Sequence, residues 1–305
     1  MSIPSLSQRP AVGLRAAPAG LRAWLQTLSV LFKWRVVSLL LLAAVGGAFL
    51  GAGGWPGLGP LSLLLLSGWL TASGAAGLNE YLEREPDGLM GRTRGRPLVT
   101  GALRPRWVLW ASLALIWLPA LALLPFNPAL SFFLLLGAAI YVGVYTVWLK
   151  PRTLLNIVIG GAAGSAAVMS GGAAVGAWRE PAVVVLALLV FLWTPTHFWS
   201  LAILYRSDYQ RAQVPMLPVK ASARGSAGWV LLHSAAAVLA AGLLGLTPSL
   251  GSLYLAPVGL ASAYLLAQNL RLLARPTPRH ARALFITSNF YLMVVLAAAC
   301  LASVW

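Results

Sequence analysis

Charged side chains are scarce in this sequence of 305 residues: they make up 9% of it, whereas 59% of the residues are hydrophobic. A soluble globular domain has about a quarter charged residues, so this chain has too little ionisable surface to cover a water-soluble globule. The apolar majority excludes a disordered chain, and glycines without a period exclude collagen. A single cysteine, Cys300, excludes a disulfide scaffold. The composition therefore indicates a protein that lies within a lipid bilayer.

Acidic residues are the scarcest of the charged types. There are 6 Asp and Glu against 22 Lys and Arg, which gives a net charge of +16. Such an excess is compatible with nucleic-acid binding. In a membrane protein, however, basic loops retained on the cytoplasmic side produce the same excess. We therefore expect the lipid bilayer as a partner and no nucleic acid.

Apolar runs long enough to cross a membrane are present in nine places, since about 20 residues suffice for one crossing. We predict an all-α polytopic membrane protein, a bundle of nine transmembrane helices. Its domains are expected to be a basic cytoplasmic N-terminal arm over 1–31 and a single nine-helix intramembrane domain over 32–304. The expected spans are 32–53, 59–80, 106–125, 128–149, 153–176, 181–204, 226–247, 251–271 and 282–304.

The cations segregate to one side of these nine spans. When the N-terminus is placed in the cytoplasm, Arg179 is the one Lys or Arg that lies outside. If one span had been miscounted, the cations would be distributed over both sides of the membrane, so this distribution supports the count. Trp55, Trp178 and Trp305 fall at the outer ends of spans, where interfacial aromatics belong. The sequence thus predicts a cytoplasmic N-terminus, an outer C-terminus and a multi-pass protein of the cell inner (plasma) membrane.

The first 35 residues have two interpretations. They contain no acid and are rich in Arg, Ser and Ala, which is typical of an organellar transit peptide. A basic cytoplasmic arm that holds the orientation explains the same composition, and we favour that interpretation. Under the first interpretation the membrane would be an organellar one.

The acidic residues gather at the cytoplasmic ends of two spans. Asn79, Glu83 and Asp87 recur at four-residue spacing, so on a helix they form a stripe along one face. Stacked oxygen ligands suit Mg²⁺, which takes one or two protein carboxylates and completes its shell with water and substrate phosphate. Pro86 predicts that the helix kinks or ends near Glu83 to Glu85, so that Asp87 reaches the site from a loop.

Cations and a further acid accompany this stripe. Arg92, Arg94 and Arg96 add guanidinium groups that fork onto phosphate oxygens, and carboxylates beside arginines are what a diphosphate–Mg²⁺ site requires. Asp208, just past span six, is placed to supply an opposing carboxylate, and Lys150 lies at the same membrane level. The alternative to a binding site is a solvated loop whose charges neutralise one another. For Lys150 the alternative is a side chain that extends to the membrane surface and anchors the helix there.

A histidine lies beside a proline in span six. Pro195 predicts a local break in this helix. His197 is an ionisable group in an apolar run, and such groups are more often functional than structural. The alternative is a histidine hydrogen-bonded to a neighbouring helix, which is how we interpret His233 in span seven.

These segments resemble the UbiA-type intramembrane prenyltransferases, most closely the protoheme IX farnesyltransferase (heme O synthase) branch. The first motif is Asn79-x3-Glu83-x3-Asp87, followed by Arg92-Thr93-x2-Arg96-Pro97-Leu98. The resemblance extends over roughly 30–300. It includes Tyr145-Thr146-x2-Leu149-Lys150, the glycine-rich segment 156–164, Trp193-Thr-Pro-x-His197-Phe-Trp, the segment 208–219 that begins Asp208-Tyr209, and the segment 281–292.

This resemblance implies a prenyltransferase that joins farnesyl diphosphate to heme b, giving heme O and diphosphate, with Mg²⁺ required. It implies a cytoplasmic active site and, as protein partners, a heme-processing enzyme or a terminal oxidase. By matching position it assigns catalytic metal ligation to Asn79, Glu83, Asp87 and Asp208, diphosphate binding to Arg92, Arg96 and Lys150, and the heme-side pocket to His197, Asn156 and Trp199.

The sequence departs from the family pattern in three places. Leu204 stands four residues before Asp208, where quinone-type relatives carry a second Asp. Pro86 interrupts the first motif, and Pro151 interrupts the basic run after span four. An aromatic acceptor, a precursor of quinone or chlorophyll, is the alternative within the family. A transporter is the alternative outside it, although a transporter would place ionisable groups near the midplane.

Overall fold

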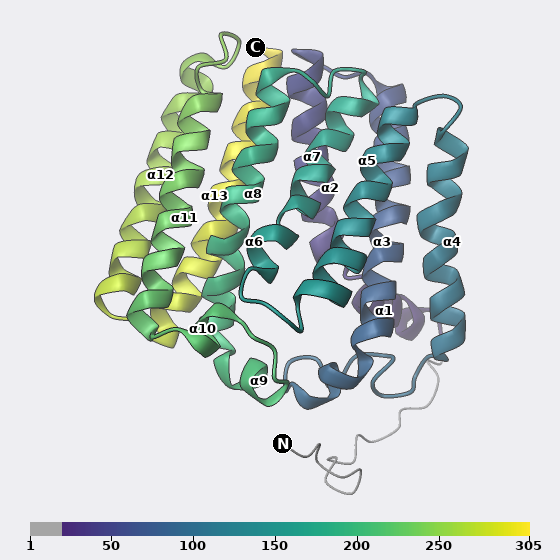
Figure 1. The fold of residues 1–305 in the computed structure, drawn as a ribbon. Coiled ribbons are helices and arrows are strands. Elements are labelled where there is room, and N and C mark those ends of the chain that lie inside the picture. The colour runs from purple at the N-terminus through teal and green to yellow at the C-terminus, as the bar shows by residue number, and fades with distance from the viewer. Residues whose placement is uncertain (1–19) are drawn as a thin grey trace, which may run out of the picture.

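The computed structural model describes residues 20–305, and within this range the regular structure is helical. The helices lie side by side in one bundle, with the C-terminus at the end opposite α9 and α10 (Figure 1). The elements are α1 (Leu21–Leu31), α2 (Trp34–Ala52), α3 (Leu58–Leu89), α4 (Pro105–Leu123), α5 (Pro128–Ala138), the π-helix η2 (Ala139–Leu149), α6 (Asn156–Gly160), α7 (Ala162–Ala174), α8 (Pro181–Leu204), α9 (Arg206–Arg211), α10 (Leu217–Lys220), α11 (Ala223–Leu244), α12 (Gly251–Ala274) and α13 (Pro278–Val304).

Nine helical segments of the described chain are long and apolar enough to cross a membrane. They confirm the predicted all-α polytopic fold, and the segments Pro128–Leu149 and Pro181–Leu204 coincide with the predicted spans. The predicted second span was too short, because α3 continues from residue 80 to Leu89. Its last turns are polar, so an apolar run does not reveal them even though the backbone stays helical.

The helix breaks predicted at two prolines are absent. Pro86 lies inside α3, so Asp87 is carried on the helix rather than on a loop. Pro195 likewise lies inside an unbroken α8. A proline deprives one carbonyl four residues earlier of its partner, and a neighbouring helix can compensate locally. At α8 this carbonyl is that of Phe191, and a Cβ atom built on Gly161 would lie 3.3 Å from its oxygen.

Small residues set the closest helix crossing, between α2 and α7. A Cβ atom on Gly171 would lie 1.8 Å from the carbonyl oxygen of Ala44. On Gly47 it would lie 2.1 Å from the carbonyl oxygen of Val168. Neither position has space for a side chain. Close backbone approach through small residues is the packing mode that membrane helices favour.

The N-terminal region contributes a helix next to the loop that follows α3. Residues 1–19 of the predicted arm lie outside the described residues, and α1 occupies the rest of it. Leu31 at the end of α1 packs in one apolar cluster with Leu98 and Val108. This contact places α1 over the loop between α3 and α4, which carries Arg96.

Candidate active site at the end of helix α3

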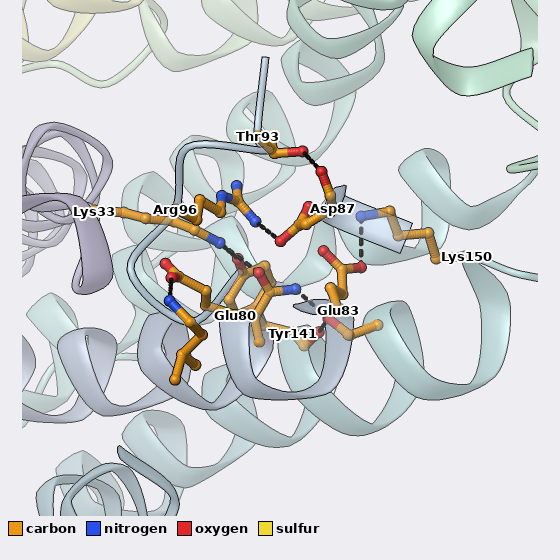
Figure 2. Close-up of polar contacts among 11 residues, drawn as sticks. Lys33, Glu80, Glu83, Asp87, Thr93, Arg96, Tyr141 and Lys150 are labelled. Carbon is orange, nitrogen blue, oxygen red and sulfur yellow. Dashed lines mark hydrogen bonds and ion pairs between the residues drawn. The ribbon is translucent and has the colours of Figure 1, made fainter. Parts of the chain in front are cut away.

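The polar stripe on α3 faces the protein interior. Asn79 and Asp87 are each 1% exposed and Glu83 is 7% exposed. The four-residue spacing places the three side chains on one helical face, as the sequence predicted. Figure 2 shows Glu83 and Asp87 pointing toward two cations that come from other segments. Burial of two carboxylates is costly without partners, so their partners define the site.

Each member of the stripe binds a basic side chain from a different part of the chain. Lys150, which follows η2, donates to Oε1 of Glu83 at 2.5 Å. Arg96, in the loop after α3, forms an ion pair with Oδ2 of Asp87 (Figure 2). Lys33, directly before α2, donates to Oδ1 of Asn79. Two segments that are remote in sequence and the loop that follows α3 thus converge on three successive turns of one helix.

The pKa shifts of the three cations in this cluster differ in direction. Burial opposes the charge on both Lys150 and Arg96, but the carboxylates of Glu83 and Asp87 raise the pKa of each above its ordinary value. Lys33 has no carboxylate partner of its own. Burial, reinforced by the charge of Arg96, lowers the pKa of Lys33 to about 7. Arg96 and Lys150 are therefore permanent cations, whereas Lys33 titrates near neutrality.

The opposing acid comes from the short helix α9. Asp208 is 7% exposed; its Oδ2 accepts from the backbone N–H of Arg92 at 3.3 Å, and its Oδ1 pairs with Arg211. A Cβ atom on Gly91 would lie 3.7 Å from Oδ1 of this carboxylate. The structure thus brings Asp208 to the loop that follows α3. The guanidinium of Arg92 instead lies over the ring of Tyr205, 5.7 Å from its centroid.

Sequence reasoning missed Lys33 as a member of this site and treated it only as a cation of the basic arm. Its Nζ also donates to the hydroxyl of Tyr141 at 2.9 Å. Asn79 completes the network by donating to Thr146 Oγ1 at 2.9 Å. A lysine just before an apolar span is usually a snorkelling anchor, so the sequence carries no signal that this one points inward.

Glu80 is a second residue whose role sequence reasoning left undefined. It is 0% exposed, and its Oε1 accepts from the backbone N–H of Leu98 at 3.2 Å. Its Oε2 is buried without a partner among residues 20–305. The contact attaches the loop that carries Arg96 to α3 one residue after Asn79 (Figure 2).

The predicted heme-side residues contact different neighbours. The His197 ring stacks between Trp193 and Phe285, with centroids 4.7 and 4.6 Å away, and its Nδ1 lies 3.2 Å from Ser288 Oγ on α13. Trp199 instead contacts α11, where its ring and that of His233 form a T-shaped pair with centroids 5.3 Å apart. His197 and Trp199 thus contact two different helices.

Asn156 begins α6 and is 0% exposed. Its Nδ2 donates to the Thr153 carbonyl at 2.7 Å. Two buried atoms of the heme-side set have no partner among the described residues, Nε1 of Trp199 and Oδ1 of Asn156. Neither atom joins His197 in a single network.

The fold and the site together define a polytopic membrane protein with a buried cluster of carboxylates and cations at one end of a helical bundle. The chain belongs to the UbiA prenyltransferase family, whose model matches residues 39–302. It is a prenyltransferase.

Named relatives are similar over most of the chain. A protoheme IX farnesyltransferase of Metallosphaera sedula is 42% identical over 268 residues, 87% of this chain and 92% of the relative. Protoheme IX farnesyltransferase 2 of Paramagnetospirillum magneticum is 39% identical over 276 residues, 90% of this chain and 96% of the relative.

Solved structures share the fold at lower sequence identity. A UbiA homologue from Aeropyrum pernix K1 superposes with a TM-score of 0.67 and 20% identity, covering 87% of this chain and 96% of that chain. A UbiA homologue from Archaeoglobus fulgidus bound to GPP and Mg²⁺ gives a TM-score of 0.61 and 17% identity, covering 90% and 99%. These likenesses establish the helical fold.

Proposed function

We propose that this prenyltransferase transfers a farnesyl group from farnesyl diphosphate to a vinyl group of heme b, which gives heme O. The names of relatives about 40% identical over most of the chain support heme as the acceptor. The observation that carries the proposal is the pairing of buried Glu83 and Asp87 with Lys150 and Arg96. Carboxylates for a metal and cations for an anion meet in one place.

Magnesium fits the donor set of this site. Oε2 of Glu83 and Oδ1 of Asp87 accept no hydrogen bond from residues 20–305. Within the same range no three acidic, His or Cys side chains gather closely enough to hold a metal by themselves. Such a sparse set suits Mg²⁺, which takes one or two carboxylates and binds substrate phosphate for the rest. We propose that Asn79, Glu83 and Asp87 would hold the Mg²⁺–diphosphate from the α3 side, and that Asp208 would hold it from the opposite side.

The difficult step is breaking the carbon–oxygen bond of the allylic diphosphate. Negative charge grows on the leaving group, and bound Mg²⁺ would neutralise part of it. Arg96 and Lys150 are charged and already oriented at the site, so they stabilise the departing diphosphate more than the intact substrate. A well-aimed donor of this kind contributes about 3 kcal/mol to lowering the barrier. Arg92 is proposed as a third diphosphate ligand from the same loop.

The allylic cation then needs protection from water until the acceptor reacts. The stacked rings of Tyr141 and Tyr145, with centroids 6.0 Å apart, lie beside the carboxylate cluster and offer faces to a cation. The π electrons of the heme vinyl group attack the farnesyl carbon. Water adds to the new cation on heme and loses a proton, which leaves the hydroxyethyl group of heme O.

His197 is proposed to face the heme. The hydroxyl of Ser288 donates to the Phe285 carbonyl at 2.8 Å, so the Nδ1–H of His197 is the donor in the contact with Ser288. That tautomer leaves the Nε2 lone pair free, and Nε2 has no partner among the described residues. We propose Trp199 and Asn156 as further heme-side residues, since each has a polar atom without a partner among residues 20–305.

The proposal also includes the placement of the enzyme. The cation distribution supports a cell inner membrane protein whose active site faces the cytoplasm. We propose that the protein consists of a single intramembrane domain over 32–304, preceded by a basic arm over 1–31. We also propose a heme-processing enzyme or a terminal oxidase as the protein partner, since either could accept a modified heme.

The deciding experiment offers two acceptors to the purified protein. It is incubated with farnesyl diphosphate, Mg²⁺ and either heme b or an aromatic acid, and the products are identified by mass. We expect heme b to gain a farnesyl group and a hydroxyl group, while the aromatic acid is unchanged. A prenylated aromatic acid would assign the enzyme to the aromatic-acceptor branch of the family. No prenylated product in either reaction would contradict the proposal.

A further inference from the structure

A cavity of about 370 Å³ opens between the end of α12 and the start of α13. It is lined by Gln268, Arg271, Arg279, His280 and Ala283. None of these residues belongs to the candidate active site. The turn between the two helices lies at the same end of the bundle as α9 and α10, and α12 is at the outer edge of the bundle (Figure 1). The cavity is therefore a separate feature, on the rim of the protein.

The floor of this cavity contains a polar group without a partner. Gln268 is 5% exposed, yet its side-chain amide makes no hydrogen bond with any of residues 20–305. The amide atoms of Gln268 are not among the buried polar atoms sealed from solvent without a partner, so the amide is open toward the cavity that this residue lines. An amide that is buried on all sides but one, and faces a cavity on that side, is placed to bind a ligand there.

The walls of the cavity favour a negatively charged ligand. Arg271 and Arg279 are exposed, and neither forms an ion pair within the described chain. The Nδ1–H of His280 donates to the Arg275 carbonyl at 2.7 Å and so fixes the ring in the cavity wall. The N-terminus of the 27-residue helix α13, capped by Thr277, adds the positive end of its dipole. Guanidinium groups and a helix N-terminus are a combination that recognises phosphate.

The position of the cavity identifies the source of that phosphate. Leu270 on α12 and Ile286 on α13 are 56% and 57% exposed, so apolar surface on both helices faces outward beside the cationic cavity. A ligand that matches both surfaces has an anionic head and an apolar body. A soluble anion would match the cavity alone.

We propose that this cavity binds the headgroup of an anionic phospholipid from the surrounding leaflet. Arg271 and Arg279 bind the phosphate oxygens, and the Gln268 amide donates to a headgroup oxygen inside the cavity. The acyl chains then lie along the exposed apolar faces of α12 and α13. This site is independent of the proposed reaction, because it shares no residue with the carboxylate cluster.

The test uses native mass spectrometry of the full chain in detergent, with phosphatidylglycerol or phosphatidylcholine added at equal concentration. We expect wild type to retain phosphatidylglycerol, and R271Q/R279Q to retain about tenfold less, since each arginine near a headgroup strengthens binding severalfold. The matched control is R104Q/R224Q, which removes two exposed charges on other segments, away from the cavity lining. The control should retain the lipid as wild type does.

A second variant separates a built site from general attraction between charges. Gln268→Leu keeps every charge, and we expect it to weaken retention of phosphatidylglycerol severalfold, with an unchanged melting temperature as evidence of folding. Inorganic phosphate at the same concentration should not displace the lipid. Displacement by phosphate, equal losses in the two double variants, or full retention by Gln268→Leu would each overturn the proposal.

Discussion

The ammonium of Lys33 lies 2.9 Å from the hydroxyl of Tyr141 and simultaneously donates to the side-chain oxygen of Asn79. This contact joins the residue before α2 to the π-helix η2 and to the middle of α3. Lys33 has φ of 50°, a left-handed conformation that is uncommon for a residue with a side chain, and it precedes the first turn of α2. The backbone of Lys33 is thus held in an unfavourable conformation, and this conformation directs its ammonium toward the candidate site.

The low pKa of Lys33 predicts a pH dependence of stability. Its folded pKa is about 7, whereas its ordinary value is 10.5. Between these values the unfolded chain binds more protons than the folded one, so stability rises with pH across this window. We expect the melting temperature of wild type in detergent to increase by a few degrees from pH 7 to pH 10 relative to Lys33→Met. The exposed Lys220→Met should keep the wild-type rise. Identical pH profiles for wild type and Lys33→Met would contradict the burial of a titrating ammonium.

Loss of either α3 carboxylate should abolish prenyl transfer. Glu83→Ala and Asp87→Ala each remove a proposed metal ligand and leave Lys150 or Arg96 without its partner. We expect a decrease in kcat/KM of about a hundredfold or more, measured by product mass with excess Mg²⁺. Glu180→Ala, which changes an exposed acid just before α8, is the control and should retain full activity. Normal activity in both α3 variants would remove the metal-site proposal.

Glu80 should act by holding the Arg96 loop rather than by touching substrate. Glu80→Gln retains an oxygen that accepts from the Leu98 N–H, so its kcat/KM should stay within severalfold of wild type. Glu80→Ala removes the acceptor, and we expect the KM for farnesyl diphosphate to rise about tenfold while kcat falls less. Limited proteolysis at 90–104 should be faster in Glu80→Ala alone. Equal effects of the two substitutions on KM would indicate that the charge of Glu80, and not its hydrogen bond, matters.

The α2–α7 crossing should not tolerate a side chain. A Cβ atom on Gly171 would lie 1.8 Å from a carbonyl oxygen of α2, so Gly171→Ala must push the two helices apart. We expect a loss of several kcal/mol of stability, seen as a lower melting temperature or poor recovery from the membrane. Gly228→Ala is the matched control on α11, where a Cβ atom meets nothing within 4 Å. A normal melting temperature for Gly171→Ala would contradict this packing.

Local patterns predicted the α3 stripe correctly, but not the details around it. The spacing of Asn79, Glu83 and Asp87 is a property of one helix, so sequence periodicity is enough to place them on one face. The prolines misled the prediction because the loss of one backbone donor does not interrupt either helix in the bundle. At Pro195 the freed carbonyl of Phe191 lies beside Gly161, which belongs to another span and cannot be identified as a contact from the sequence.

What the sequence determined by itself was the class of molecule: nine membrane-length apolar segments, cations segregated between alternate loops, and scarce acids gathered at one level. Composition and periodicity are local quantities, and the bilayer imposes their pattern directly. Only the tertiary structure decided which cation meets which acid. Lys33 and Lys150 reach α3 from segments 46 and 67 residues away from their partners. Such pairings depend on how the helices pack around one another, and packing is set by close contacts such as Gly171 against Ala44 that no single segment encodes.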